Sequence, residues 1–231
     1  MINVSELKKS YSGNIVLNIP ELKIQKGESF GLVGNNGAGK TTFFRLILDL
    51  ILADSGYVEI NGIKTPAESS WKHFTGSYID EGFLIDFLTP EEYFDFIAGV
   101  YEISSDDKKR FLGSFEEFFN DEIQGKNKFI RDFSRGNKQK IGIAAALMSN
   151  PELLVLDEPF NSLDPTTQIR LKKILDNLNK EKEITMLISS HDLKHVTEVC
   201  DRIVILEQGN VVHDLQTTGA TLQELENYFS V

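Results

Sequence analysis

The sequence contains little cysteine, and this limits how its fold can be stabilised. Its 231 residues include a single cysteine, Cys200, so no internal disulfide can form. This fits a reducing compartment. Within VCDRIVIL, Cys200 is expected to be a small buried hydrophobic side chain rather than a reactive thiol.

Basic residues are also scarce relative to acidic ones. The chain has 24 Lys and Arg against 35 Asp and Glu, which gives a formal net charge of -11. Nonspecific binding to nucleic acid relies on clustered Lys and Arg that displace counterions from phosphates. The charge balance therefore argues against nucleic acid as a partner.

Long apolar runs are missing as well. The longest, such as IGIAAALM (141–148), fall far short of the ~20 residues that a membrane span needs. The start, MINVSELKKS, lacks the apolar core of a secretion signal. We therefore expect a cytoplasmic protein, which could sit on a membrane through a partner.

Both ends of the chain do contain short apolar strands that alternate with helices. The predicted strands are IVLNIPELKI, ESFGLVG, YVEING, ELLVLDEP, ITMLISS and RIVILEQ. Predicted helices run from about Thr41 to Leu52, through Ile169 to Leu178, and from Asp192. This alternation indicates a mostly parallel sheet that helices cover on both faces.

The middle of the chain, from about residue 83 to 148, has a helical pattern. Thr89, Pro90 and Glu92 form a helix start, with Thr as cap, Pro in the first turn and Glu closing a capping box. Ten of the sixteen phenylalanines lie between Phe83 and Phe133. They are expected to form the core of a small helical subdomain.

A second interpretation of these phenylalanines stays open. Some of them, Phe83 and Phe87 first, could line a surface for another protein rather than a core.

The segment GNNGAGKT (34–41) fits the pattern G-x-x-x-x-G-K-[ST] without a mismatch. Its glycines let successive N–H groups converge on an anion, and the following helix points its positive end at the same place. Lys40 would neutralise the β and γ phosphates of a nucleotide, and Thr41 would offer a hydroxyl to Mg²⁺. The predicted nucleotide-binding residues here are Gly34, Asn35, Asn36, Gly37, Ala38, Gly39, Lys40, Thr41 and Thr42. The alternative is a glycine-rich turn that binds nothing.

A second pattern, LLVLDEP (153–159), is an apolar strand that ends in two carboxylates. Asp157 at the strand tip can hold the magnesium shell, directly or through water. Glu158 can point at the γ-phosphate side and polarise a water. The phosphate loop alone also fits kinases and GTPases, so this pair narrows the class.

With these two motifs in place, the whole chain resembles the ATP-binding subunit of an ABC transporter. FSRGNKQK (133–140) is similar to the family's signature sequence, with Ser134 and Gly136 matching its serine and second glycine. A serine cap at an exposed helix start forms another anion site. NSLD resembles the D-loop and supplies Asp164. His191 resembles the switch histidine, and Tyr11 sits where the family stacks an aromatic ring on adenine.

The resemblance implies an α/β fold of the P-loop NTPase class. It has a mostly parallel sheet flanked by helices, an antiparallel β subdomain and an inserted helical subdomain. We expect one ABC-type domain over residues 1–231, with the ATP-binding core at 1–82 and 151–231. The helical subdomain, at 83–150, would carry the signature sequence.

The sequence departs from the family pattern at two places. Phe133, Arg135 and Asn137 replace Leu, Gly and Gln of the signature. Arg135 would either attract the phosphates of a second subunit or point into solvent. Glu81 stands where the family usually has a glutamine that touches the metal and the transmembrane partner. We expect Glu81 to accept hydrogen bonds from metal-bound water, at the cost of an added negative charge.

The function implied by the resemblance is ATP hydrolysis that drives transport. Two copies would pack head to tail, with ATP and Mg²⁺ between the loop of one and Ser134 and Gly136 of the other. Glu158 would activate water, and His191 would steady the γ-phosphate. Dimer closure would be transmitted to a separate transmembrane permease, which would export a substrate. The permease would also hold the protein on the inner face of the cell membrane.

Three other functions stay open at this point. A soluble ABC ATPase acting on ribosomes or DNA usually has two ATP modules or a long coiled coil, and this chain has neither. A P-loop kinase would not need the signature or the D-loop. A nonhydrolytic ATP-binding regulator would leave Glu158 idle.

Overall fold

A computed structural model describes residues 1–182 and 184–229 and contains two sheets. The larger sheet has the strand order β10-β9-β3-β8-β7-β6. Its strands are β3 (Ser29–Val33), β6 (Thr75–Tyr78), β7 (Leu153–Leu156), β8 (Thr185–Ser190), β9 (Arg202–Glu207) and β10 (Asn210–Gln216). All neighbours pair in parallel except β10, which runs antiparallel to β9. The predicted mostly parallel sheet is confirmed.

The strands of this sheet contribute to two hydrophobic cores, one on each face. Side chains of a strand alternate between faces. In β7, Leu153 and Val155 therefore enter one core, while Leu154 and Leu156 enter the other. All four residues are fully buried, which requires packed layers on both sides of the sheet.

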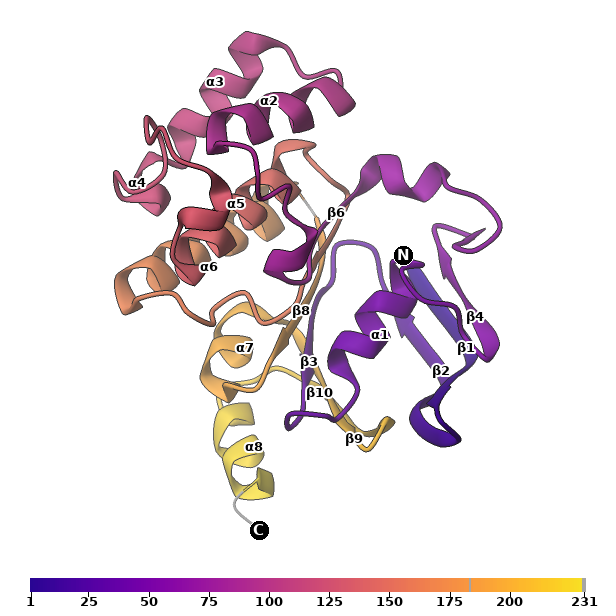
Figure 1. The fold of residues 1–231 in the computed structure, drawn as a ribbon. Coiled ribbons are helices and arrows are strands. Elements are labelled where there is room, and N and C mark those ends of the chain that lie inside the picture. The colour runs from indigo at the N-terminus through magenta and orange to yellow at the C-terminus, as the bar shows by residue number, and fades with distance from the viewer. Residues whose placement is uncertain (183, 230–231) are drawn as a thin grey trace.

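The smaller sheet is antiparallel and has the order β2-β1-β4-β5. Its strands are β1 (Ile2–Tyr11), β2 (Asn14–Ile24), β4 (Ser55–Ile60) and β5 (Ile63–Lys64). Helix α1 (Lys40–Ile47) lies between this sheet and the larger one (Figure 1). Phe43 and Phe44 of α1 share one core with residues of both sheets. The antiparallel β subdomain is thus confirmed, although β1 was not predicted from the sequence.

Helix α1 is shorter than the sequence predicted. It ends at Ile47 instead of running to Leu52. Asp49 has a φ of 52°, which is the left-handed conformation common just after a helix end. The N–H of Leu50 then donates to the carbonyl of Arg45 at 2.8 Å and closes the turn.

The chain between β6 and β7 forms a separate helical layer, at the upper left of Figure 1. Its elements are the helices α2 (Pro90–Val100), α3 (Ser105–Ser114), α4 (Glu116–Phe119) and α5 (Arg135–Met148), with the short 3₁₀ turns η2 (Glu81–Phe83) and η3 (Ile130–Asp132). The predicted capping box at the start of α2 is present. Thr89 Oγ1 accepts from the Glu92 N–H at 3.3 Å, and Glu92 Oε2 accepts from the Thr89 N–H at 2.8 Å.

The phenylalanines of this layer divide into a buried and an exposed group, apart from Phe111, which is partly buried. The buried ones form part of one continuous core and are Phe94, Phe115, Phe118, Phe119 and Phe133. The exposed ones are Phe83, Phe87, Phe96 and Phe129. The expected helical core is thus confirmed for the buried group, and the interpretation of Phe83 and Phe87 as a surface for another protein stays a prediction.

The rest of the chain completes the layers around the larger sheet. It contributes α6 (Pro165–Lys182), α7 (Leu193–Val199), α8 (Thr221–Phe229) and the 3₁₀ turn η1 (Ser70–Phe74). Across residues 1–182 and 184–229, no helix is both long and apolar enough to span a bilayer. The division into a core at 1–82 and 151–231 and a helical subdomain at 83–150 stays a prediction.

Candidate functional site: a phosphate loop facing two carboxylates

The glycine loop lies between the end of β3 and the start of α1, where the sequence predicted it. A Cβ at Gly34 would lie 2.4 Å from the carbonyl oxygen of Leu206, and one at Gly39 would lie 2.8 Å from that of Val16. Gly39 also has a φ of 108°, which L side chains rarely adopt. Glycine is needed at both positions because neighbouring strands approach the loop so closely.

Lys40 is buried beneath this loop. Its Nζ donates to the carbonyl oxygen of Gly34 at 2.7 Å, which curls the loop around the ammonium. In the described residues no side chain caps the start of α1. The N–H groups of its first turn and the Lys40 charge are therefore directed at the same space, which suits an anion.

Asp157 lies directly after β7 and faces the first turn of α1. Thr41 Oγ1 donates to its Oδ2 at 2.5 Å, and the hydroxyl of Ser189 donates to its Oδ1. Burial raises the pKa of the Asp157 carboxyl, and the hydrogen bonds from Ser189 and Thr41 partly offset that rise. The structure thus joins two of the three predicted metal-site residues, Thr41 and Asp157, directly.

The Glu158 carboxylate contacts the side chains of Lys40 and His191. Its Oε1 lies 3.4 Å from Lys40 Nζ, and its Oε2 lies 2.9 Å from Nδ1 of His191. The backbone of Glu158 has a φ of 49°, an uncommon conformation for a non-glycine residue. The chain thereby turns sharply after Asp157. The two adjacent carboxylates consequently contact different partners, Thr41 and Ser189 for Asp157, and Lys40 and His191 for Glu158.

Two residues that the sequence did not single out hold this turn. Ser189 accepts from the Glu158 N–H at 2.9 Å while it contacts Asp157. The buried Gln139 donates to the carbonyl oxygens of Glu158 and Pro159, at 3.1 and 2.5 Å. Ser189 is a polar residue at the end of the apolar strand β8, and it meets Asp157 because β8 pairs with β7, which the sequence does not show.

Two cavities meet at these residues. One, of about 350 Å³, is lined by the phosphate loop and by Tyr11, which is 48% exposed. The other, of about 250 Å³, is lined by Asp80, Glu81, Arg135 and Asp157. Thr41 and Glu158 line both cavities. The structure therefore brings Tyr11 and Glu81 to neighbouring cavities that share Thr41 and Glu158.

The remaining predicted site residues lie elsewhere. Ser134 caps α5 by accepting from the Asn137 N–H at 3.3 Å, and its side chain is exposed. Asp164 caps α6 through the N–H groups of Thr166 and Thr167, at 3.0 and 3.1 Å. Of the described residues, Ser134, Gly136 and Asp164 line neither of the two cavities.

Gly136 has a role within its own chain. A Cβ at this position would lie 2.4 Å from the carbonyl oxygen of Ser162, in the NSLD segment. The signature helix and the NSLD segment therefore touch backbone to backbone, and a side chain would separate them.

The other histidine near the site and the cysteine serve packing. His195 stacks on Phe160 with ring centroids 4.6 Å apart, and burial lowers its pKa. Cys200 is buried, as expected, and burial raises the pKa of its thiol to about 12.

A strand, a glycine loop with a buried lysine, a helix, and a second strand ending in a carboxylate define a P-loop NTPase domain. A family profile described as ABC transporter matches residues 17–161. The chain belongs to the ABC transporter family, as one of its ATPase domains.

Curated relatives agree with this assignment. An uncharacterised ABC transporter ATP-binding protein of Synechocystis is 33% identical over 98% of this chain and 65% of its own length. The bacitracin transport ATP-binding protein BcrA of Enterococcus faecalis is 33% identical over 93% of the chain and 69% of its own length. The linearmycin resistance ATP-binding protein LnrL of Bacillus subtilis is 34% identical over 92% and 68%. The chain spans about two thirds of the length of these relatives.

Solved structures share the fold. A structure described as the ATP binding subunit of an ABC transporter has a TM-score of 0.86 and 29% identity, and the match covers 100% of both chains. The dimeric structure of MJ0796, a bacterial ABC transporter cassette, has a TM-score of 0.82 and 25% identity over 95% of this chain and 100% of that one.

Proposed function

We propose that this chain hydrolyses ATP as one of two copies in a head-to-tail dimer, and that dimer closure drives a separate membrane-spanning permease. The observation that carries the proposal is the position of Glu158. Its carboxylate reaches both the Lys40 ammonium of the phosphate loop and the His191 ring, which supports a position at the γ-phosphate end of a bound ATP.

The chemistry follows from these contacts. The Lys40 ammonium would bind the β and γ oxygens of a triphosphate, and its proximity to Glu158 would bring the γ-phosphorus next to that carboxylate. Glu158 would then accept a proton from a water that attacks the γ-phosphorus. The bond from that phosphorus to the β–γ bridging oxygen breaks, and ADP leaves with the electron pair. His191 would donate a hydrogen bond to the γ-phosphate and keep Glu158 in place.

The residues around Thr41 suit Mg²⁺. They offer a hydroxyl, the Asp157 carboxylate and the Glu81 carboxylate, and hard oxygen ligands are those that Mg²⁺ prefers. Within residues 1–182 and 184–229, no cluster of three or more His, Cys, Asp or Glu side chains could hold a metal. This fits an ion that takes further ligands from nucleotide phosphates and water. When bound there, Mg²⁺ would neutralise charge that develops on the phosphates.

A second copy is needed to complete the site. Ser134 is exposed at the N-terminal end of α5, a helix of 14 residues, and it lines neither phosphate cavity of its own chain. In a two-fold dimer each copy would present this helix end to the γ-phosphate held by the other. The dimeric MJ0796 cassette supports such a pairing.

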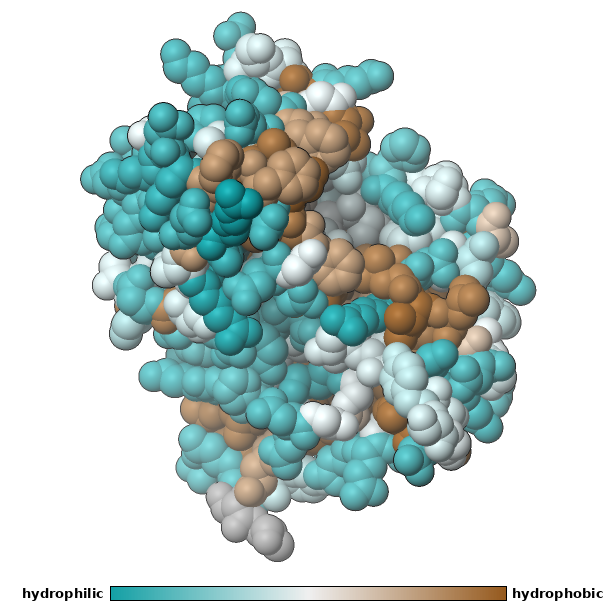
Figure 2. All heavy atoms as spheres, viewed as in Figure 1, coloured by the Kyte–Doolittle hydropathy of each residue, from teal (hydrophilic) through white to brown (hydrophobic). Residues whose placement is uncertain are grey.

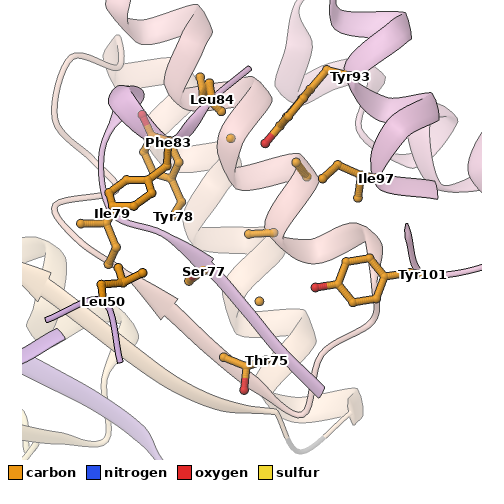
Figure 3. Close-up of a pocket in the computed structure, with 14 residues that line it drawn as sticks. Leu50, Thr75, Ser77, Tyr78, Ile79, Phe83, Leu84, Tyr93, Ile97 and Tyr101 are labelled. Carbon is orange, nitrogen blue, oxygen red and sulfur yellow. The ribbon is translucent and has the colours of Figure 1, made fainter. Parts of the chain in front are cut away.

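The permease would dock at an apolar depression beside the helical layer. A cavity of about 180 Å³ lies between the β6 segment and α2, with Tyr93, Ile97 and Tyr101 on one side and Leu50 and Ile79 on the other (Figure 3). On the face drawn in Figure 2, hydrophobic atoms gather over the helical layer and near the end of α1. Phe83, which lines this cavity, is 51% exposed, and Phe87 in the same segment is 63% exposed. Exposed apolar side chains of this size are typical of a surface that another protein covers.

Export is the direction we propose. BcrA is named for bacitracin transport and LnrL for linearmycin resistance. Resistance to a compound is consistent with removing it from the cell. The permease would hold this chain on the inner face of the cell membrane.

Two measurements test the proposal. Phosphate release from ATP should be measurable for the wild-type chain and lost for Glu158→Gln. Affinity purification from detergent-solubilised membranes should recover a protein with several membrane spans, and Phe83→Ser together with Phe87→Ser should reduce that recovery without changing phosphate release in detergent. ATP binding without any release of phosphate would instead support a nonhydrolytic regulator.

A further inference from the structure

The loop that carries Glu81 is attached to its surroundings at two points. The first lies before Glu81, where the carbonyl oxygen of Tyr78 accepts from the Asp157 N–H at 2.9 Å. The second is Asp80, whose Oδ2 lies 3.1 Å from Nη2 of Arg45. The first attachment leads to the metal-site carboxylate, and the second leads to helix α1.

Asp80 uses both of its carboxylate oxygens. While Oδ2 pairs with Arg45, Oδ1 accepts from the Gly82 N–H at 2.8 Å and caps the 3₁₀ turn that Glu81 begins. A Cβ at residue 82 would lie 2.9 Å from the same Oδ1. Glycine at this place therefore lets the turn close tightly enough for the carboxylate to serve both partners.

Arg45 belongs to the helix that presents the phosphate loop. Helix α1 begins at Lys40, so Arg45 lies about one turn behind Lys40 and Thr41. The Arg45 and Asp80 side chains are 40% and 42% exposed, and a pair this exposed adds little to stability. The pair matters instead for position, because it connects α1, the helix that follows the phosphate loop, to the residue next to Glu81.

We propose that Asp80 is a positioning residue, which ties Glu81 through Arg45 to the phosphate-loop helix and so keeps Glu81 beside Thr41. Glu81 and Thr41 line the same cavity, and both would serve the metal bound with ATP. This inference rests on the proposed metal role of Glu81. A glutamate adds a negative charge next to Asp157, so its distance from Thr41 has to be held more closely than that of a neutral side chain.

The test compares Mg²⁺ dependence in four variants. Asp80→Asn keeps an oxygen that can cap Gly82 but loses the charge that pairs with Arg45, and Arg45→Gln removes the other partner. Each should raise the Mg²⁺ concentration for half-maximal ATPase about fivefold, which corresponds to one ion pair. The double variant should be no worse than either single one, because the two residues act as a unit. Arg45→Lys should restore part of the wild-type dependence.

A binding readout accompanies the ATPase assay. Affinity for a fluorescent ATP analogue should be unchanged in EDTA for Asp80→Asn, whereas the gain in affinity on adding Mg²⁺ should shrink. Asp176→Asn is the matched control, since it removes an exposed ion pair of similar length with Lys180, on α6. This control should leave both readouts at the wild-type value.

Two results would overturn the inference, and they differ. If Glu81→Ala changes Mg²⁺ dependence but Asp80→Asn and Arg45→Gln do not, Glu81 has its proposed role and Asp80 does not position it. If Glu81→Ala leaves Mg²⁺ dependence at the wild-type value, Glu81 does not contribute to the metal site. In that case the proposal that Asp80 positions Glu81 for the metal is wrong as well.

Discussion

The Nζ of Lys40 lies 3.4 Å from Oε1 of Glu158, so the cation of the phosphate loop and the proposed general base lie side by side. A triphosphate held by the Lys40 ammonium would therefore bring its γ-phosphate next to the Glu158 carboxylate. This relationship leads to different expectations for the two residues.

Replacing Glu158, the proposed general base, should abolish ATP hydrolysis and leave ATP binding intact. Glu158→Gln keeps the shape of the side chain but cannot take a proton, so hydrolysis should fall by ~10²- to 10⁴-fold. ATP affinity measured by calorimetry should stay equal or improve, because the competing carboxylate charge is gone. Steady-state phosphate release at the wild-type rate would refute the role of Glu158.

Replacing Lys40, the cation of the phosphate loop, should weaken ATP binding. Lys40→Ala deletes a buried charge that would form charge-assisted hydrogen bonds with phosphate, so ATP affinity should fall by about 10- to 100-fold. Titration calorimetry measures this directly, with thermal unfolding as a check that the variant is folded. Unchanged affinity would show that the loop does not bind phosphate through Lys40.

Two helical glycines should respond to alanine with opposite signs. Gly136→Ala places a Cβ 2.4 Å from the Ser162 carbonyl oxygen, so it should destabilise the fold by about 1–3 kcal/mol and lower ATPase activity. Gly99→Ala, in α2, meets no atom within 4 Å and should stabilise by about 0.5–1 kcal/mol, since alanine favours the helix. Denaturant titration compares the two. Equal effects would show that the signature helix does not pack tightly on the NSLD segment.

The Asp157 carboxylate should destabilise the nucleotide-free protein. Burial raises its folded-state pKa, so the ionised form opposes folding, and this cost appears as the pH rises through the ordinary aspartate pKa toward the raised one. Asp157→Asn should therefore melt at a higher temperature than the wild type at neutral pH. The difference should shrink in acid, where Asp157 is protonated. A difference that grows in acid would contradict this account.

The sequence predicted the parts of the site that depend on local chemistry. The glycine spacing, Lys40 and Thr41 belong to one continuous loop, and Asp157 and Glu158 follow one apolar strand, so their roles could be inferred from neighbours along the chain. Tyr11 and Glu81 were placed by resemblance, and the structure locates both beside the phosphate loop.

Other contacts could not be predicted because strand pairing creates them. Ser189 meets Asp157 since β8 lies beside β7, and no sequence pattern fixes that order. The end of α1 was missed because it depends on the left-handed conformation of Asp49, a residue type that also occurs inside helices. The pairing of Asp80 with Arg45 likewise needs the folded chain.

The most direct test of the central claim mixes two variants that are each inactive. Lys40→Ala lacks the phosphate loop's cation but has an intact Ser134, whereas Ser134→Arg blocks the signature but keeps Lys40. If each ATP is hydrolysed between two copies, mixed dimers contain one complete site, and phosphate release should reappear when the variants are combined. If the mixture stays as inactive as its components while both variants remain folded, each chain would have to work alone, which contradicts the shared site.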